Sequence, residues 1–336
     1  MTRWIDNLTT SLAKREEDNL YRHRNIIDSP QGVVINIAGR NYINFSSNDY
    51  LGLANHPDVV SSFQTATKEY GAGAGASHLV VGHQKPHHDL ENALAKFTGR
   101  DRALVFSSGY MANLGILSAL LSKDDAVIQD KLNHASMIDG AQLSSANFLR
   151  FKHNDLDHLR VQLDKTTVCP RKILAVDGVF SMDGDMSPLN QQSRICNDYD
   201  AALMVDDAHG FGWLGENGAG ISEHFHLGQQ DLPILMGTLG KAVGVAGAFV
   251  AGSNALIESI IQSSRRYIYT TALPPACAAA ILQSLKVIKD EPQRRKHLKA
   301  LIDYFKEKTA NLDFQFLPSS SAIQALVVGD NSCTLA

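Results

Sequence analysis

Short, nearly continuous apolar runs alternate with longer helical segments from about residue 100 onward, and this alternation constrains the fold more than any other feature. The runs lie at residues 103–106, 126–128, 148–151, 173–176, 203–205, 234–236 and 248–250. Strands that are apolar on both faces and separated by helices are typical of a parallel sheet covered on both sides. We therefore predict an α/β domain, built on a mainly parallel sheet, over residues 45–255.

The segment before this domain, residues 1–44, begins with an amphipathic pattern. Trp4, Leu8 and Leu12 recur at helical spacing, with charged residues following them. This spacing predicts a helix that lies on the protein's own body, and binding to a membrane surface is the alternative. A secretory signal would instead carry a continuous apolar core, so we expect none here.

The segment after the domain, residues 256–336, predicts a smaller C-terminal domain. It is mostly helical up to Leu312, and residues 325–328 then form the first strand of a second sheet. Because a single strand cannot bury its own face, we expect an α+β unit that is incomplete in this sequence.

Composition excludes several classes of protein. The 336 residues are 44% apolar and 20% charged, which is ordinary for a globular chain, and the net charge of −4 argues against a broad nucleic-acid or membrane footprint. No apolar run approaches the roughly 18 residues of a transmembrane helix. The four cysteines form no C-x-x-C pair, which favours reduced thiols and a cytoplasmic location.

Polar residues follow two of the predicted strands, at the edge where open α/β sheets bind ligands. Ser108, Gly109 and Tyr110 lie between a strand and a helix, where backbone N–H groups suit a phosphate; an ordinary capped turn is the alternative. Asp206, three residues before His209, could hold a protonated ring nitrogen, share a metal with the histidine, or cap a loop.

Lys241 follows a third strand, in an apolar context that would desolvate its amine. Desolvation lowers the pKa of an amine and suits it to Schiff-base chemistry, although most lysines are simply exposed. A phosphate-binding turn, a carboxylate and a lysine at three strand ends are together what pyridoxal 5′-phosphate requires.

Motifs across nearly the whole chain resemble those of the α-oxoamine synthases, a family of fold-type I pyridoxal-phosphate enzymes. The matching stretches follow the family's order and lie at residues 44–53, 108–113, 133–136, 178–185, 205–210, 238–241 and 269–275. Residues 321–324 and 328–332 are most similar to the biotin-pathway branch of the family.

The resemblance implies roles around the cofactor. Lys241 would bind its aldehyde and remove the α-proton of the amino acid, and Asp206 would pair with the pyridinium nitrogen. His209 would hydrogen-bond the phenolic oxygen, with Ser181 beside it, and His134 would stack on the ring. The phosphate would be bound by the turn at residues 108–110 and by Thr238.

The resemblance also implies how substrates and subunits meet. Asn48 and His134 would face the amino acid, and Thr270 and Thr271 would reach the phosphate of a neighbouring subunit in a homodimer. Basic residues at 22–24, beginning with Arg22, could meet the distal carboxylate of the acyl donor or form a solvated turn. A carboxylate-binding arginine would follow Ala336, so we expect this sequence to be incomplete.

The reaction implied is a decarboxylative condensation of L-alanine with a pimeloyl thioester, carried by coenzyme A or by an acyl carrier protein. One alternative within the family joins glycine to acetyl-CoA, or uses another acyl-CoA. Outside the family, the alternatives are an NAD-dependent oxidoreductase and a binding module without chemistry.

Two further motifs are set aside. Residues 71–75 imitate a dinucleotide fingerprint, but a helix is predicted before them, where the fingerprint requires a strand. The histidines at 78, 83, 87 and 88 suggest a metal site, but Pro86 would interrupt a helix that aligned them, so we predict no metal.

Overall fold

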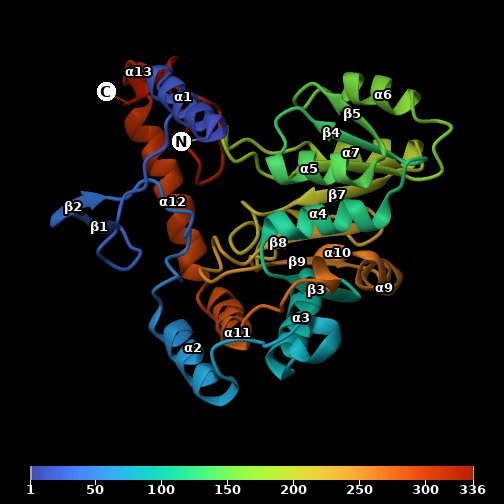
Figure 1. Ribbon diagram of the computed structural model, residues 1–336, viewed down its shortest axis with the longest axis horizontal. Coiled ribbons are helices and arrows are strands. Elements are labelled where there is room, and N and C mark those ends of the chain that lie inside the picture. Colours follow the sequence, from blue (N-terminus) through green and yellow to red (C-terminus); the bar gives the residue numbers. More distant parts are fainter. Residues whose placement is uncertain (1, 336) are drawn as a thin grey trace.

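The computed structural model describes residues 2–335, and a seven-stranded sheet lies at its centre (Figure 1). The strands run in the order β3-β9-β8-β7-β6-β4-β5, and all pairings are parallel except those of β9. Their bounds are β3 Arg102–Phe106, β4 Ala126–Asp130, β5 Asn147–Phe151, β6 Lys172–Asp177, β7 Ala202–Asp206, β8 Ile234–Thr238 and β9 Ala248–Gly252. The predicted mainly parallel α/β fold is confirmed.

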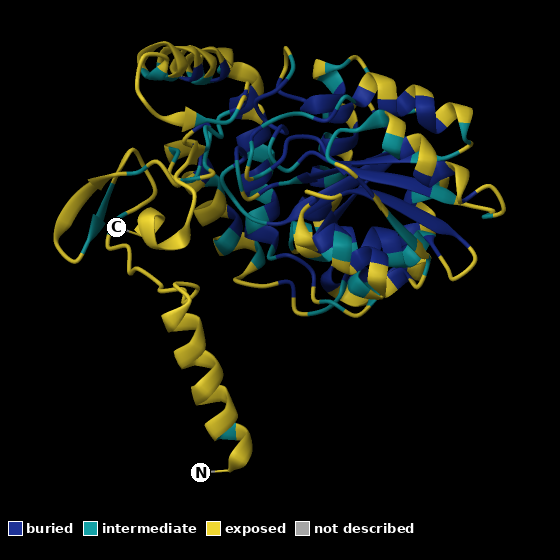
Figure 2. Ribbon diagram, turned by 90° about the horizontal axis from the view of Figure 1, so that it is seen from above, coloured by how far each residue is buried: buried dark blue, intermediate teal, exposed yellow. Residues whose placement is uncertain are grey.

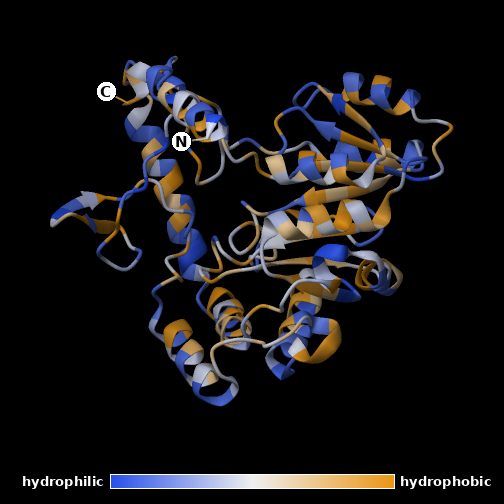
Figure 3. Ribbon diagram, in the orientation of Figure 1, coloured by the Kyte–Doolittle hydropathy of each residue, from blue (hydrophilic) through white to orange (hydrophobic). Residues whose placement is uncertain are grey.

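Helices cover both faces of the sheet, because the strands bury apolar side chains in alternation on each side. One face packs against α4 (Gly109–Leu120), α5 (Ala135–Ser144), α9 (Asn254–Ser263) and α10 (Arg265–Ile268). The opposite face packs against α3 (Lys85–Thr98), α6 (Leu156–Asp164), α7 (Leu189–Asp198), α8 (Ile221–His224) and α11 (Pro275–Asp290). Figure 3 shows apolar residues concentrated in the strands between these layers.

The N-terminal helix, α1 (Arg3–Glu17), buries none of its residues, and Trp4 is 68% exposed. Figure 2 shows it projecting away from the body of the molecule. The prediction that this helix lies on the protein's own body is therefore wrong. Its apolar spacing is real, but the described chain presents no apolar surface against it. A small hairpin of β1 (Val34–Ile37) and β2 (Arg40–Ile43) follows.

The C-terminal segment contains α12 (Pro292–Thr309), β10 (Gln315–Phe316), β11 (Leu326–Val327) and α13 (Asn331–Leu335). A second small sheet is present, but the expectation that residues 325–328 form its first strand is wrong, because β11 pairs antiparallel with β10, which precedes it. A two-residue strand carries too little periodicity to be found from sequence. The division into residues 1–44, 45–255 and 256–336 stays a proposal.

The segment between the hairpin and the sheet holds α2 (Pro57–Tyr70), which packs on α11, and the short π-helical turn η1 (His78–Gly82). Among residues 2–335, no helix combines the length and the apolar character needed to cross a membrane.

Candidate active site

A cavity of about 200 Å³ opens where β6, β7 and β8 end and α4 begins. Parallel strands end at one edge of the sheet, so side chains far apart in sequence meet there. The cavity is lined by Gly109, Tyr110, His134, Ser136, Asp177, Val179, Ser181, Asp206, Ala208, His209, Met236, Thr238 and Lys241. The structure thus brings together most of the residues predicted to bind the cofactor.

Other predicted residues lie outside the cavity lining. Ser108 caps α4, its hydroxyl accepting a hydrogen bond from the Met111 backbone N–H at 3.3 Å. Asn48 does not line the cavity, and its Oδ1 lies 3.3 Å from the Tyr50 hydroxyl. Thr270 and Thr271 lie on a loop beyond α10, and Arg22 is exposed in the N-terminal segment. The structure of one chain does not bring these three to its own cavity.

Asp206 ends β7 and is buried, with both carboxylate oxygens occupied. The Asn113 side chain donates to Oδ2 at 2.7 Å, and the Ala208 backbone N–H donates to Oδ1 at 2.9 Å. Asn113 is fully buried on α4 and also donates to the Ser136 hydroxyl at 2.9 Å. These bonds fix the orientation of the carboxylate. Asn113 falls within the motif at residues 108–113, but its contact with Asp206 was not predicted, because its place one turn after Gly109 is the only signal in the sequence.

A second carboxylate, Asp177, ends β6 and lies opposite Asp206 in the strand register. It accepts a hydrogen bond from the His134 backbone N–H at 3.0 Å. Burial, together with the charge of Asp206, raises the pKa of Asp177. Two neighbouring carboxyl groups therefore lie at this end of the cavity, where a carboxylate suits a protonated ring nitrogen.

Lys241, which follows β8, places its Nζ 2.6 Å from Nε2 of His209. Burial lowers the pKa of Lys241, and Asp206 and Asp177 oppose that effect in part. Burial and the nearby lysine lower the pKa of His209 to about 3, so its ring is neutral at pH 7. A lysine whose ammonium form is disfavoured is suited to bind an aldehyde.

The residues present fit pyridoxal 5′-phosphate. The first N–H groups of α4 have no partners within the helix and point to where an anion would be stabilised. A Cβ on Gly109 would come within 3.1 Å of the Met236 methyl group, so glycine leaves this side of the turn uncrowded. The N-terminus of α4 that would bind the phosphate, the two carboxyl groups and the lysine amine all line one cavity.

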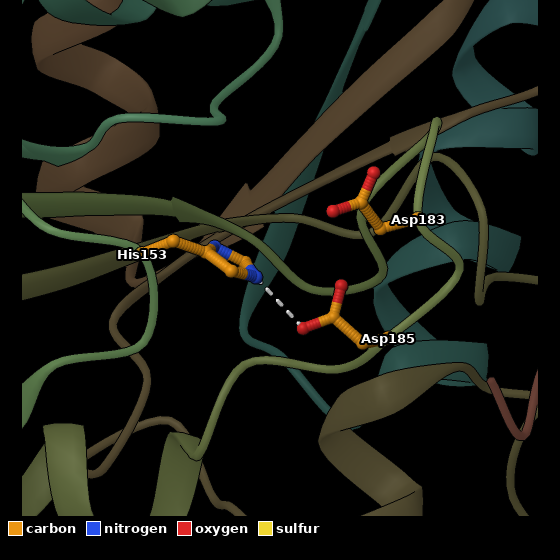
Figure 4. A group of neighbouring side chains, drawn as sticks. All are labelled: His153, Asp183 and Asp185. Atoms are coloured by element: carbon orange, nitrogen blue, oxygen red, sulfur yellow. Dashed lines mark hydrogen bonds and ion pairs between the residues drawn. The ribbon is translucent and has the colours of Figure 1, made fainter. Parts of the chain in front are cut away.

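A group with the donor chemistry of a metal site lies nearby, formed by His153, Asp183 and Asp185 (Figure 4). Both ring nitrogens of His153 already face carboxylates, Asp130 at 3.0 Å and Asp185 at 2.9 Å. Burial lowers the pKa of His153, but the two carboxylates outweigh burial and raise it overall. The arrangement is therefore a hydrogen-bonded network in which two carboxylates stabilise the protonated form of His153.

The histidines at residues 78–88 also lie close together, so the prediction that Pro86 would keep them from aligning is wrong. Pro86 lies in the first turn of α3 and helps to begin the helix, rather than interrupting it. Nδ1 of His78 lies 3.0 Å from Nδ1 of His83. His87 uses one nitrogen on the Leu273 carbonyl and accepts from the Gln84 N–H with the other.

Comparison with known proteins identifies the family. Residues 40–335 match the family described as aminotransferase class I and II. The chain belongs to this family. Its relatives from Hahella chejuensis and Cellvibrio japonicus, both called 8-amino-7-oxononanoate synthase, are 51% and 53% identical over 100% and 98% of this chain. The alignments cover 84% and 82% of those two proteins.

Solved structures agree with this assignment. A serine palmitoyltransferase variant from S. paucimobilis with bound pyridoxal phosphate superposes with a TM-score of 0.91 and 30% identity, over 97% of this chain and 86% of that one. The 8-amino-7-oxononanoate synthase of Francisella tularensis gives 0.74 and 34%, over 85% and 81%. The resemblance to fold-type I α-oxoamine synthases is confirmed, and the cofactor is pyridoxal phosphate.

Proposed function

We propose that this chain catalyses the decarboxylative condensation of L-alanine with a pimeloyl thioester to give 8-amino-7-oxononanoate, a step of biotin biosynthesis. The observation that carries the proposal is 51–54% identity, over nearly the whole chain, to relatives of that name. The cavity at the strand ends supplies the groups that this chemistry needs.

Bound pyridoxal phosphate supplies an electron sink for the bonds broken at the α-carbon of the amino acid. Asp206, oriented by Asn113, keeps a proton on the ring nitrogen and so maintains that sink. Lys241 would hold the aldehyde and take the α-proton, and its lowered pKa supports both roles. His209 would donate to the phenolic oxygen, and His134 would contact the ring.

The remaining contacts concern the phosphate and the second subunit. Gly109, Tyr110 and Thr238 bind the phosphate from within the chain, which their place in the cavity supports. Thr270 and Thr271 serve the partner's site in a homodimer, which fits their position outside the cavity of their own chain. All four cysteines are free, as suits the cytoplasm.

The proposal is tested by product analysis. Purified protein, loaded with pyridoxal phosphate, is given L-alanine or glycine with pimeloyl-CoA, pimeloyl-acyl carrier protein or acetyl-CoA. We expect carbon dioxide release and the mass of 8-amino-7-oxononanoate with alanine and a pimeloyl donor. Formation of 2-amino-3-oxobutyrate from glycine and acetyl-CoA, and no product from alanine, would assign the chain to another branch of the family.

The matched variant for this assay is Lys241→Ala. Because no other amine lines the cavity, we expect turnover and borohydride-stable cofactor labelling to be lost together. Binding through the phosphate is retained in part. Stable label in the variant would show that the lysine is misassigned.

A further inference from the structure

The hydroxyl of Tyr50 lies 2.7 Å from Nδ1 of His209, on the side of the ring opposite Lys241. Tyr50 belongs to the segment between β2 and α2, and it precedes His209 by 159 residues in the sequence. Its partly buried ring packs against the core beneath the site. The hydrogen bond between Tyr50 and His209 therefore connects the N-terminal part of the chain to the lining of the cavity.

We propose that Tyr50 is a positioning residue that fixes the tautomer of His209, so that Nε2 carries the ring proton and faces Lys241 and the cofactor. This inference rests on the proposed function, in which His209 donates a hydrogen bond to the cofactor.

The protonation states of the two side chains support this direction. Burial raises the pKa of Tyr50, so its hydroxyl keeps its hydrogen. The pKa of His209 is lowered to about 3, so the ring is neutral and has one N–H and one bare nitrogen. A neutral imidazole can donate toward the cofactor only if something selects which nitrogen carries the proton.

The role of His209 toward the cofactor favours Tyr50 as the donor. If Tyr50 donates to Nδ1, the bond is 2.7 Å long and Nε2–H is left to face Lys241. In the opposite arrangement Nδ1–H donates to Tyr50, whose hydrogen must then turn to Asn48 Oδ1 at 3.3 Å. That arrangement leaves Nε2 without a hydrogen, so the ring could not donate to the phenolic oxygen of the cofactor. Both arrangements keep the 2.7 Å contact, and only the first leaves an Nε2–H that can donate to the cofactor.

The backbone of His209 is held separately. The Trp213 indole N–H donates to the His209 carbonyl at 2.6 Å. Trp213 fixes where the residue lies, and it leaves the proton position on the ring to Tyr50.

The test compares the holoenzyme with Tyr50→Phe, which keeps the aromatic ring and removes only the hydroxyl. The control is Tyr199→Phe, which removes a hydroxyl that bonds Asp164 at 2.9 Å near the C-terminus of α7. In ¹⁵N-histidine spectra, with His209→Gln used to assign the signal, wild type should show the Nε2–H tautomer. We expect Tyr50→Phe to show a mixture or the Nδ1–H form, and Tyr199→Phe to match wild type.

The cofactor absorbance gives a second measurement. The midpoint of its pH titration should move in Tyr50→Phe and not in the control, with kcat lowered about tenfold, as for the hydrogen-bond partners that orient metal-binding histidines. An Nδ1–H signal in the wild type would overturn the proposal even if the variant failed to fold. So would a fall in kcat without a change of tautomer, since that indicates a structural role.

The proposed function and this inference can fail separately. Absence of 8-amino-7-oxononanoate from the wild-type assay would overturn the function. The tautomer in the holoenzyme is measured without substrate, and it decides the role of Tyr50.

Discussion

Both carboxylate oxygens of Asp206 accept hydrogen bonds, from the Asn113 side-chain NH₂ group and from the Ala208 backbone N–H, and both groups act as donors in this arrangement. An asparagine at 206 would present an NH₂ group to one of these donors. The change therefore removes the charge and one hydrogen bond while keeping the shape of the side chain.

We accordingly expect Asp206→Asn to fold and to lower kcat of the condensation by at least about 100-fold, as for the loss of one preorganised electrostatic group. Steady-state kinetics with saturating pyridoxal phosphate measure the rate, and far-ultraviolet circular dichroism checks the fold. A rate within a few-fold of wild type would contradict the assignment of Asp206.

At the scale of elements, α4 and α5 pack closely and carry the site between them. Asn113 lies on α4, and His134 is the N-cap of α5. A Cβ on Gly140 of α5 would lie 2.9 Å from the Asn113 carbonyl oxygen and 3.1 Å from a Leu117 methyl group. The close approach of the two helices therefore depends on glycine at this position.

Gly140→Ala gains up to about 1 kcal/mol in helix propensity but overpacks the contact, which costs about 1–3 kcal/mol. Because the nearest obstacle is backbone, we expect a net loss of about 1–2 kcal/mol in the free energy of unfolding and weaker cofactor binding. Urea denaturation measures the first. Gly73→Ala is the control for stability, since no atom lies within 4 Å of its added Cβ. If Gly140→Ala and Gly73→Ala were equally stable, the packing of α4 on α5 would not depend on glycine at position 140.

At the scale of the whole molecule, buried neutral histidines make stability depend on pH. Burial, with a smaller effect from His87 and His83, lowers the pKa of His78 to about 3 from an ordinary value near 6.5. Between these values the unfolded chain binds a proton that the folded chain does not. Stability is therefore full above about pH 6.5 and falls as the pH falls toward 3.

His78→Gln removes this contribution. We expect the free energy of unfolding, measured in urea from pH 7 to 4.5, to fall less steeply with falling pH than it does in wild type. The two slopes should differ by at most about 1.4 kcal/mol per pH unit. Glu91, whose pKa burial raises to about 7, acts in the opposite direction but is present in both proteins. Exposed His297 provides the control variant His297→Gln, which should keep the wild-type slope. A slope in His78→Gln equal to that of wild type would contradict a buried neutral histidine.

The sequence by itself determined the parallel sheet, the strand ends that carry Asp206 and Lys241, and the motifs that identify the family. These features are local, because apolar periodicity and strand–turn–helix order can be seen within a few residues. It also supplied Thr270, Thr271 and Arg22 as predictions, which one chain does not test.

Only the tertiary structure decided which residues support the site from behind. Asn113 reaches Asp206 across 93 residues of sequence, and Tyr50 reaches His209 across 159. The same holds for the free-standing α1, the pairing of β10 with β11 and the gathering of His78 with His83. Each depends on which distant segments meet, and the local pattern of a segment does not specify the segment that it will meet.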